Sequence, residues 1–553
     1  MNRRVIFSFL FIFFGYFLFA MFSLSLRLPF SFPIEAYWLS FVFVSIPILI
    51  EVFFAESNSK LRFVYILLFS LLLHLQYAAV DFSPYLSSSD ALADYRLTDA
   101  IISDSRWFTE GQSPLAFEYG FYPLTNFIYL TFSLLTGIPL MLVVKFLVII
   151  KAFVVTPIVY KLFKRFFDRR ISYLATMIFL ASPGAILFPH KETFAVIFFF
   201  IAVYVITHVK KTRTYLFLGL ISFFSLLITH HFTMYVFLAL LTSLFLWTKI
   251  GKRKKTLKIS SHFFMLSWIL FSAWISFISW AIILRHQSLI IRMFSQILLS
   301  GQLTFSELMP LYAPYEQIMI WLGYGLTLGF AGIGFICYMH TRNKKNHSNE
   351  FLAMAYPLII LLIGATILRF SGASSSVMVS HRAYEFGYIL IGAMVAFFVI
   401  RVFPLRRNVG IKALMAILIV LIIIIGPMAG AIHPRTFTNV SRVVSSKAIS
   451  LNEWLAEFSN DSESVIGDKL VGLIVSGYGE RTVFENLQFF LEDTSLPFIQ
   501  TSQSSNSNYF VTYTYMVDFY QIDLHKFDIN PYLNNVYSNS VLNVYRICDR
   551  SLS

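Results

Sequence analysis

Charged residues and cysteines are scarce in this chain, and each shortage excludes a class of protein. Only 13% of the 553 residues are charged, whereas about 25% is usual in soluble domains, so a soluble protein with a large core is excluded. The two cysteines, Cys337 and Cys548, lie in a hydrophobic segment and in the terminal tail, which argues against a disulfide framework or a cysteine metal site. No internal repeat is visible, so the inverted repeats of many transporters find no support.

Apolar and aromatic side chains, in contrast, are abundant. Hydrophobic residues make up 57% of the sequence, and phenylalanine alone contributes 62, which indicates an integral membrane protein. The formal net charge is +14, from 43 basic and 29 acidic residues. Because the excess basic residues lie in short loops, membrane orientation and anionic lipid head groups account for them. Membrane lipids are therefore expected partners, and nucleic acid is not.

The basic clusters between the hydrophobic segments fall on one side of the membrane, which the positive-inside rule identifies as the cytoplasmic face. They are Asn2–Arg4, Lys161–Arg170, Lys210–Arg213, Lys249–Lys258, Arg342–Lys345 and Arg401–Lys412. Acids and histidines with catalytic potential gather on the outer face, in Ser87–Pro123, Phe188–Thr193, Thr229–Phe232, Arg285–Glu316 and Arg369–Glu385. A membrane protein that collects its polar residues at one interface is typical of an enzyme working there.

Thirteen hydrophobic segments are candidates to cross the membrane, since a span takes about 20 apolar residues. They run near 5–26, 37–55, 62–80, 138–163, 171–188, 193–209, 214–230, 232–248, 260–284, 317–339, 351–368, 383–402 and 412–432. Alternation from a cytoplasmic N-terminus places every basic cluster inside. No small-residue cleavage site follows the first apolar run, so it is expected to be a retained helix rather than a signal peptide. The sequence predicts a polytopic α-helical protein of the cell membrane with about 13 transmembrane helices.

Two stretches depart from this pattern. Residues 81–137 form a polar outer loop that ends in a short apolar run, and a crossing there would invert every later loop. We therefore expect residues 123–135 to form a helix in the membrane interface, anchored by Tyr119, Phe121 and Tyr122. The tail after Pro434 has mixed polarity and predicts a small extracytoplasmic α/β domain over 433–553, after a transmembrane domain over 1–432. Its expected elements are a helix at 443–459 and strands at 464–467, 470–475, 508–514 and 541–547.

The outer loop after the third span holds the densest acidic stretch of the membrane part, Asp90, Asp94, Asp99, Asp104 and Glu110. Asp90 and Asp94 stand four residues apart, and a short helix would place them on one face. A carboxylate near the membrane surface can act as a general base toward a hydroxyl or hold a divalent cation. The alternative is that these acids only solvate an exposed loop. The sequence does not decide which of Asp90, Asp94 and Asp99 does the chemistry.

The order of these features resembles the GT-C superfamily of integral-membrane glycosyltransferases. The resemblance lies in an outer loop with Asp94, the small residue Gly111, the Tyr122-Pro123-Leu124 sequence and a span ending in Tyr160–Phe166. It implies a GT-C-like fold and transfer of a sugar from a polyisoprenyl-phosphate carrier, with Asp94 as the catalytic carboxylate. Gly467-Asp468 after a short apolar strand and a closing turn at Val536–Asn539 similarly resemble the outer tails of many archaeal and some bacterial members.

Charged residues open the span that follows Pro189. His190, Lys191 and Glu192 lie where charge is costly, so they mark a site if they face the bundle. The alternative is that they sit in head-group water and that Glu192 only favours the start of a helix. The resemblance implies a second acid or basic residue at this turn. Glu192 is then a catalytic candidate that could share Mg²⁺ or Mn²⁺ with Asp94, while Lys191 or His190 could bind a lipid phosphate.

Two further outer turns carry candidates for phosphate binding. His230 and His231 are adjacent, so they point about 100° apart on a helix and form no metal site by themselves; an ordinary hydrogen-bonded pair is the alternative. Arg382 can grip a phosphate through two parallel hydrogen bonds. A local pair of Arg382 with Glu385, three residues on, is the alternative there.

The leading hypothesis is an inverting, hexosyltransferase-type glycosyltransferase. It takes a polyisoprenyl-phosphate-linked sugar as donor and a glycan, lipid or protein as acceptor. A transporter or flippase of a lipid-linked or anionic substrate is the first alternative, and Lys145 and Lys151 inside the fourth span keep it open. A polymerase or ligase of lipid-linked glycans, or a non-catalytic relative, also remains open.

Overall fold

The computed structural model describes most of the membrane part and portions of the tail. The described residues are 3–25, 32–54, 59–77, 89–104, 120–183, 190–208, 213–250, 259–279, 313–341, 348–370, 374–402, 409–429, 446–458, 464–467, 471, 475, 483–485, 507–513, 528, 533–539 and 542–547. The chain divides into two compact units. The first comprises Met1–Ala79, Phe121–Thr125 and Phe146–Pro434, and the second comprises Val80–Gly120, Asn126–Lys145 and Arg435–Ser553.

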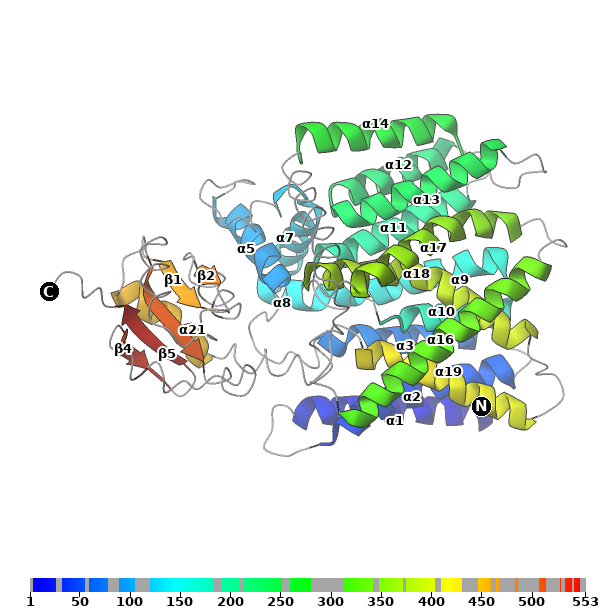
Figure 1. Ribbon diagram of the computed structural model, residues 1–553, viewed down its shortest axis with the longest axis horizontal. Helices are drawn as coiled ribbons and strands as arrows, with labels where there is room; N and C mark the ends of the chain where they lie inside the picture. Colours follow the sequence, from blue (N-terminus) through cyan, green and yellow to red (C-terminus); the bar gives the residue numbers. More distant parts are fainter. Residues whose placement is uncertain are drawn as a thin grey trace. The chain divides into compact units, whose positions relative to one another are not determined.

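The first unit is a bundle of helices that lie side by side (Figure 1). These are α1 (Arg3–Ser25), α2 (Ile34–Phe53), α3 (Ser59–His74), η1 (Leu147–Ile149), α9 (Ile150–Phe166), α10 (Arg169–Leu180), α11 (Lys191–His208), α12 (Arg213–Leu227), α13 (His231–Ile250), α14 (Ser261–Phe277), α16 (Pro314–Thr341), α17 (Ser348–Phe370), α18 (Ser374–Phe397), η4 (Phe398–Val402) and α19 (Val409–Ala429).

Eight helical segments among the described residues are long and apolar enough to cross a membrane. They are Arg3–Ser25, Ile34–Phe53, Leu140–Phe166, Lys191–His208, His231–Lys249, Pro314–Thr341, Arg382–Val402 and Val409–Ala429. The chain is thus a polytopic helical membrane protein. Each expected span overlaps a helix of the structure, while the number of crossings remains a prediction.

Helix α18 is held at close range because glycines line its contacts. A Cβ on Gly392 would come within 2.8 Å of the carbonyl oxygen of Ala175 in α10, and a Cβ on Gly334 of α16 would meet the carbonyl of Met394. Small residues of this kind let helix backbones approach closely in membranes. The part of α18 around Gly392 and Met394 is therefore packed tightly against α10 and α16.

Substitution of Gly334 by alanine is expected to destabilise the bundle. The added methyl group would overlap the backbone of Met394, and overpacking of this kind costs about 1–3 kcal/mol. Gly329 on the same helix is the matched control, because no described atom lies within 4 Å of the Cβ position there. Melting of the two purified variants in detergent checks this: Gly334→Ala should melt below Gly329→Ala, and equal melting would contradict the packing.

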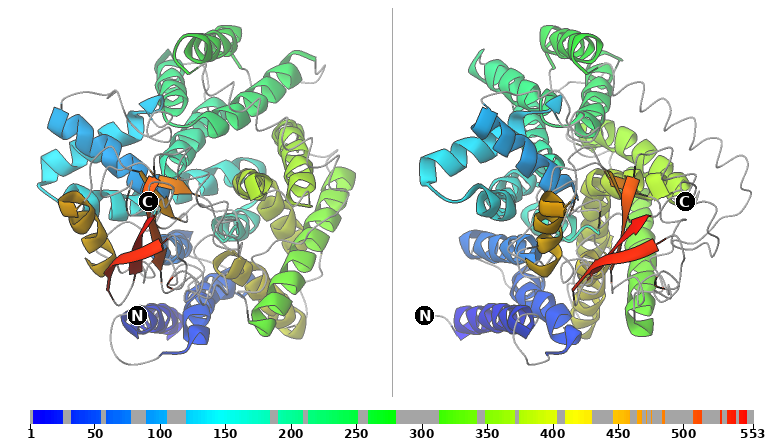
Figure 2. Two further views of the ribbon diagram at one scale, coloured as in Figure 1. Left: turned by 60° about the vertical axis from the view of Figure 1, so that its left-hand side comes forward. Right: turned by 90° about the vertical axis from the view of Figure 1, so that its left-hand side faces the viewer.

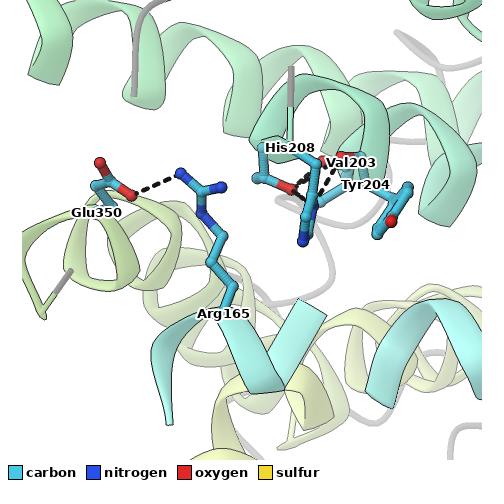
Figure 3. A network of polar contacts seen from close by, with 6 residues as sticks. Arg165, Val203, Tyr204, His208 and Glu350 are labelled. Carbon is cyan, nitrogen blue, oxygen red and sulfur yellow. Dashed lines mark hydrogen bonds and ion pairs between the residues drawn. The ribbon is translucent and has the colours of Figure 1, made fainter. Parts of the chain in front are cut away.

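A polar network joins α9, α11 and α17 at the ends away from Lys151 and Lys191. Arg165 donates to Glu350 over 3.1 Å, and the ring of His208 stacks on Tyr204 with 4.1 Å between centroids. Figure 3 shows Arg165 lying between Glu350 and His208. The Arg165–Glu350 pair links α9 to α17 at one end of α9. Near the other end of α9, Lys151 forms an ion pair with Glu385 of α18.

The second unit contains the helices of the outer loop and the tail. Helix α5 spans Ser89–Asp104, α7 spans Leu124–Thr136 and continues from the first unit, and α8 spans Leu140–Phe146. The helix predicted at 123–135 is therefore present as α7, while its place in the membrane interface stays a prediction. It ends at Gly137, whose φ of 69° is a left-handed conformation that suits glycine after a helix.

Five described strands of the tail form a mixed sheet, and helix α21 lies beside it (Figure 2). The helix is α21 (Ser446–Phe458), and the strands are β1 (Ser464–Gly467), β2 (Val483–Glu485), β3 (Ser507–Tyr513), β4 (Leu533–Ser538) and β5 (Leu542–Ile547). Their order is β2-β1-β3-β5-β4, with β1 parallel to both neighbours and the other pairs antiparallel. Trp454 of α21 contacts Tyr509 and Tyr537, so the helix packs on the sheet.

Two predictions in the tail are wrong. The apolar run 470–475 was expected to be a strand, but Val471 and Val475 are helical, because a short apolar run does not distinguish a buried helix from a strand. Val536–Asn539 was interpreted as a turn, whereas Val536 to Ser538 belong to β4. This strand lies at the edge of the sheet and exposes Asn534 and Asn535, so it lacks the apolar alternation that identifies a strand.

Candidate active site

His190 caps the start of α11, which brings the charged residues of that turn into the bundle. Its Nδ1 accepts a hydrogen bond from the backbone N–H of Glu192 over 3.0 Å, and its carbonyl accepts from the N–H of Thr193. A side chain that satisfies an otherwise unpaired N–H fixes the first turn of a helix. His190, Lys191 and Glu192 are all buried, so the alternative of residues in head-group water is wrong.

His230 caps α13 in the same way. Its Nδ1 lies 3.0 Å from the hydroxyl of Thr233 and accepts from the Thr233 N–H over 3.4 Å. The ring of His230 lies 5.9 Å from the ring of His190 and 4.8 Å from that of His231. The start of α11 therefore lies beside the start of α13. His190 from one outer turn and the adjacent His230 and His231 from another form a single group of histidines.

Acidification is expected to destabilise the protein through His230. Burial, followed by electrostatic repulsion from His231, Arg382, His190 and Lys191, holds the pKa of His230 well below its ordinary value of 6.5. The unfolded chain thus binds a proton near this pH that the folded chain does not. The stability contributed is therefore present above pH 6.5 and is lost below it, by up to about 1.4 kcal/mol per pH unit.

The variant His230→Asn tests this titration. Asparagine keeps an acceptor suited to a helix cap but does not titrate. The melting temperature should fall between about pH 7.5 and about pH 5.5 more steeply in the parent than in the variant. Parallel pH curves for the two proteins would show that His230 does not carry the effect.

Arg382 binds the acid of α11. Its Nε lies 3.0 Å from Oε2 of Glu192, whose side chain is fully buried (0% exposed), while the arginine side chain is 21% exposed. The ion pairs that the described residues show are Arg382 with Glu192 and, for Glu385, the pair with Lys151 of α9. Arg382 thus reaches α11 from α18 and joins the same cluster as the histidines.

Lys191 ties the Tyr-Pro turn to this cluster. Its Nζ donates to the backbone carbonyl of Tyr122 over 3.0 Å, and the Tyr122 ring lies 5.4 Å from the ring of His231. The N–H of Leu124 donates to the carbonyl of Ile228 over 3.3 Å. Tyr122 was expected as an interface anchor and as part of the Tyr-Pro sequence, and no sequence pattern identifies its backbone carbonyl as a partner of Lys191.

The arrangement creates a positive environment in a buried place. The N-termini of α11 and α13 each carry a partial positive charge from the helix dipole. Lys191 and Arg382 add two full positive charges, and the Glu192 carboxylate offsets one of them. Helix N-termini combined with basic side chains are suited to a phosphate group. Within the first unit, the sequence-predicted residues His190, Lys191, Glu192, His230, His231 and Arg382 therefore form one cluster suited to an anion.

Asp94 in the second unit is buried, not solvated. Its side chain is 0% exposed, and its backbone carbonyl accepts from Thr98 over 2.7 Å and from the Asn126 amide over 2.9 Å. Burial, followed by the negative charge of Asp94, raises the pKa of Tyr129. Asp99 on the same helix is exposed. The exposed-loop interpretation is thus wrong for Asp94 and holds for Asp99.

Other candidates lie outside the described residues or gain no ligand role. The side chains of Asp90 and Asp104, and the residues Glu110, Gly111 and Arg285, fall outside them. Among the residues that the structure describes, no three His, Cys, Asp or Glu side chains group into a metal site. The buried Glu192 carboxylate is engaged by Arg382, and a divalent cation shared by Glu192 and Asp94 stays a prediction.

Lys151 and Glu385 are the polar pair that reasoning from the sequence missed. Nζ of Lys151 lies 2.5 Å from Oε1 of Glu385, and both side chains are almost fully buried. Lys151 was expected only as a feature of a transporter. A lysine inside a span needs an acidic partner from another helix, and this rule would have directed attention to Glu385.

Comparisons with known proteins give matches in structure only. No protein-family model matches the chain, and no curated protein matches its sequence. The crystal structure of the Archaeoglobus fulgidus oligosaccharyltransferase in the apo form aligns with a TM-score of 0.50 and 12% identity, over 83% of this chain and 70% of that chain. ArnT from Cupriavidus metallidurans bound to undecaprenyl phosphate aligns with a TM-score of 0.47 and 13% identity, over 90% of this chain and 99% of that chain. The likeness to the oligosaccharyltransferase shows that this chain has the polytopic GT-C-like fold that its sequence indicated.

Proposed function

We propose that this protein is a glycosyltransferase. It moves a sugar from a polyisoprenyl-phosphate carrier to an acceptor on the outer face of the membrane. The proposal includes the domain division at 432/433, an extracytoplasmic tail, a cytoplasmic N-terminus and location in the cell membrane. The oligosaccharyltransferase fold supports the framework, and the site residues support the chemistry.

The observation that carries this proposal is the buried cluster around the starts of α11 and α13. Lys191, Arg382 and two helix N-termini surround one place at the end of membrane-spanning helices. A donor of this class has an apolar tail and a phosphate, so it needs positive charge at the edge of the hydrocarbon region. A soluble anion would not require such charge to be embedded at the end of apolar helices.

The proposed reaction assigns a separate task to each group. Asp94 takes the proton of the acceptor hydroxyl, whose oxygen attacks the anomeric carbon from the side opposite the phosphate. The bond between that carbon and the phosphate oxygen breaks, and the phosphate leaves on its lipid with the bonding electrons. Arg382 and Lys191 bind the phosphate as its negative charge grows. Inversion at the anomeric carbon follows from this single displacement.

Transfer assays in membranes test the proposal. Membranes that contain the protein are incubated with radiolabelled polyisoprenyl-phosphate sugars, and labelled product is separated from donor. We expect release or transfer of sugar above that of membranes without the protein. Binding of the donor without any sugar transfer would contradict the proposal that the protein is a glycosyltransferase.

A flippase or transporter of a lipid-linked anion is the second candidate, because Lys151 and Glu385 form a buried ion pair within spanning helices. Charge inside a span is typical of a transport route. Movement of a fluorescent polyisoprenyl phosphate across reconstituted vesicles, without sugar transfer, would favour this alternative. A divalent cation held by Asp94 and Glu192 remains part of the enzyme proposal, so the transfer assay is run with and without added Mg²⁺ or Mn²⁺.

A further inference from the structure

Helix α18 is connected to its neighbours by two ion pairs one turn apart. Arg382 binds Glu192 of α11 over 3.0 Å, and Glu385 binds Lys151 of α9 over 2.5 Å. Arg382 precedes Glu385 by three residues, and residues at this spacing are neighbours on a helix surface. The chain therefore offers Arg382 two acids, one on another helix and one on its own.

The buried Glu385 carboxylate requires a cation. Its side chain is 2% exposed and that of Lys151 is 4% exposed, and an unpaired charge at such a depth is strongly unfavourable. If the charge of Lys151 were removed, Arg382 would be a cation within reach on the same helix. Capture of Arg382 by Glu385 would then compete with any ligand of the guanidinium.

We infer that Lys151 is a positioning residue for Arg382. By neutralising Glu385, it keeps the Arg382 guanidinium directed toward Glu192 and available to a lipid phosphate. The inference rests on the part of the proposed function in which Arg382 binds phosphate. Lys151 touches neither substrate nor reacting atoms in this scheme.

Two variants that break the same ion pair should differ in phosphate binding. Lys151→Met leaves a buried anion that attracts Arg382, whereas Glu385→Gln leaves no such anion. We expect Lys151→Met to weaken binding of farnesyl phosphate about tenfold or more, the usual effect of losing a hydrogen bond to a charged group. Glu385→Gln should bind it like the parent. The double variant Lys151→Met/Glu385→Gln should regain the parent affinity.

Binding is measured on the full chain in detergent, with farnesol as the ligand that lacks phosphate. Each variant is first checked for a folded population by size-exclusion chromatography and thermal melting. Lys151→Gln serves if Lys151→Met does not fold, because its amide still donates to Glu385 without neutralising it. It should weaken farnesyl phosphate binding in the same direction and leave farnesol binding unchanged.

The outcomes separate this inference from the proposed function. Equal loss of affinity in Lys151→Met and Glu385→Gln would show a merely structural pair and overturn the inference, as would a double variant that stays weak. A parent that binds farnesyl phosphate no better than farnesol would overturn it too. If the parent binds the phosphate but transfers no sugar, the enzyme proposal fails, and the variant comparison still decides the role of Lys151.

Discussion

Replacement of Asp94 by asparagine is expected to reduce sugar transfer by a factor of about 100 or more, the usual contribution of a general base. Asparagine has nearly the same shape but cannot take a proton from the acceptor. The fold should survive, because Thr98 and Asn126 donate to the backbone carbonyl of Asp94, which the substitution leaves in place. The measurement is the rate of transfer at saturating donor, normalised to the amount of folded protein.

Asp99→Asn is the matched control for this prediction. Asp99 belongs to the same helix, α5, but its side chain is exposed, so it should transfer sugar at the rate of the parent. Full activity of Asp94→Asn would remove that carboxylate from the mechanism. A loss shared equally by both variants would instead indicate a general effect on the acidic loop.

Loss of Arg382 is expected to weaken donor binding by about 30-fold or more, because truncating one partner of a buried charge pair typically costs 2–5 kcal/mol. In Arg382→Ala the lipid phosphate loses a guanidinium group that can donate two parallel hydrogen bonds to it. The buried Glu192 also loses the arginine that lies 3.0 Å from it, so the variant should melt at a lower temperature. Titration with a polyisoprenyl phosphate and thermal melting measure the two effects separately.

The double variant Arg382→Ala/Glu192→Gln separates the effect of Arg382 on phosphate affinity from its effect on thermal stability. Removing the charge of Glu192 should restore much of the melting temperature, since no buried carboxylate is left without its arginine. Phosphate affinity should stay low, because glutamine supplies no positive charge. Recovery of affinity together with stability would mean that Arg382 only supports the fold.

Much of the fold was predictable from local patterns. Apolar runs of span length located the membrane helices, and the Tyr122-Pro123 sequence located the start of α7. The edge strand β4 was missed, because its exposed Asn534 and Asn535 have no apolar face to reveal it. The helical state of Val471 was missed for a different reason, since a run of six apolar residues fits either structure.

The site was predictable in composition but not in pairing. Charged residues at outer turns are costly unless they serve a purpose. This argument selected His190, Lys191 and Arg382, which the structure places in one cluster, while their roles stay predictions. It did not identify the partner of Arg382, because Glu385 is near in sequence whereas Glu192 is near only in space. Such pairings depend on how helices pack, and a single sequence does not contain that information.

The histidine caps of α11 and α13 have a consequence for how the chain can vary. Aspartate is among the favoured helix caps, but it would bring a permanent negative charge to the place proposed for phosphate. Histidine that accepts on Nδ1 makes the same hydrogen bond and brings no negative charge. We therefore expect uncharged caps at positions 190 and 230 to preserve phosphate binding and aspartate there to weaken it, so that ligand chemistry rather than helix strength limits the choice of cap.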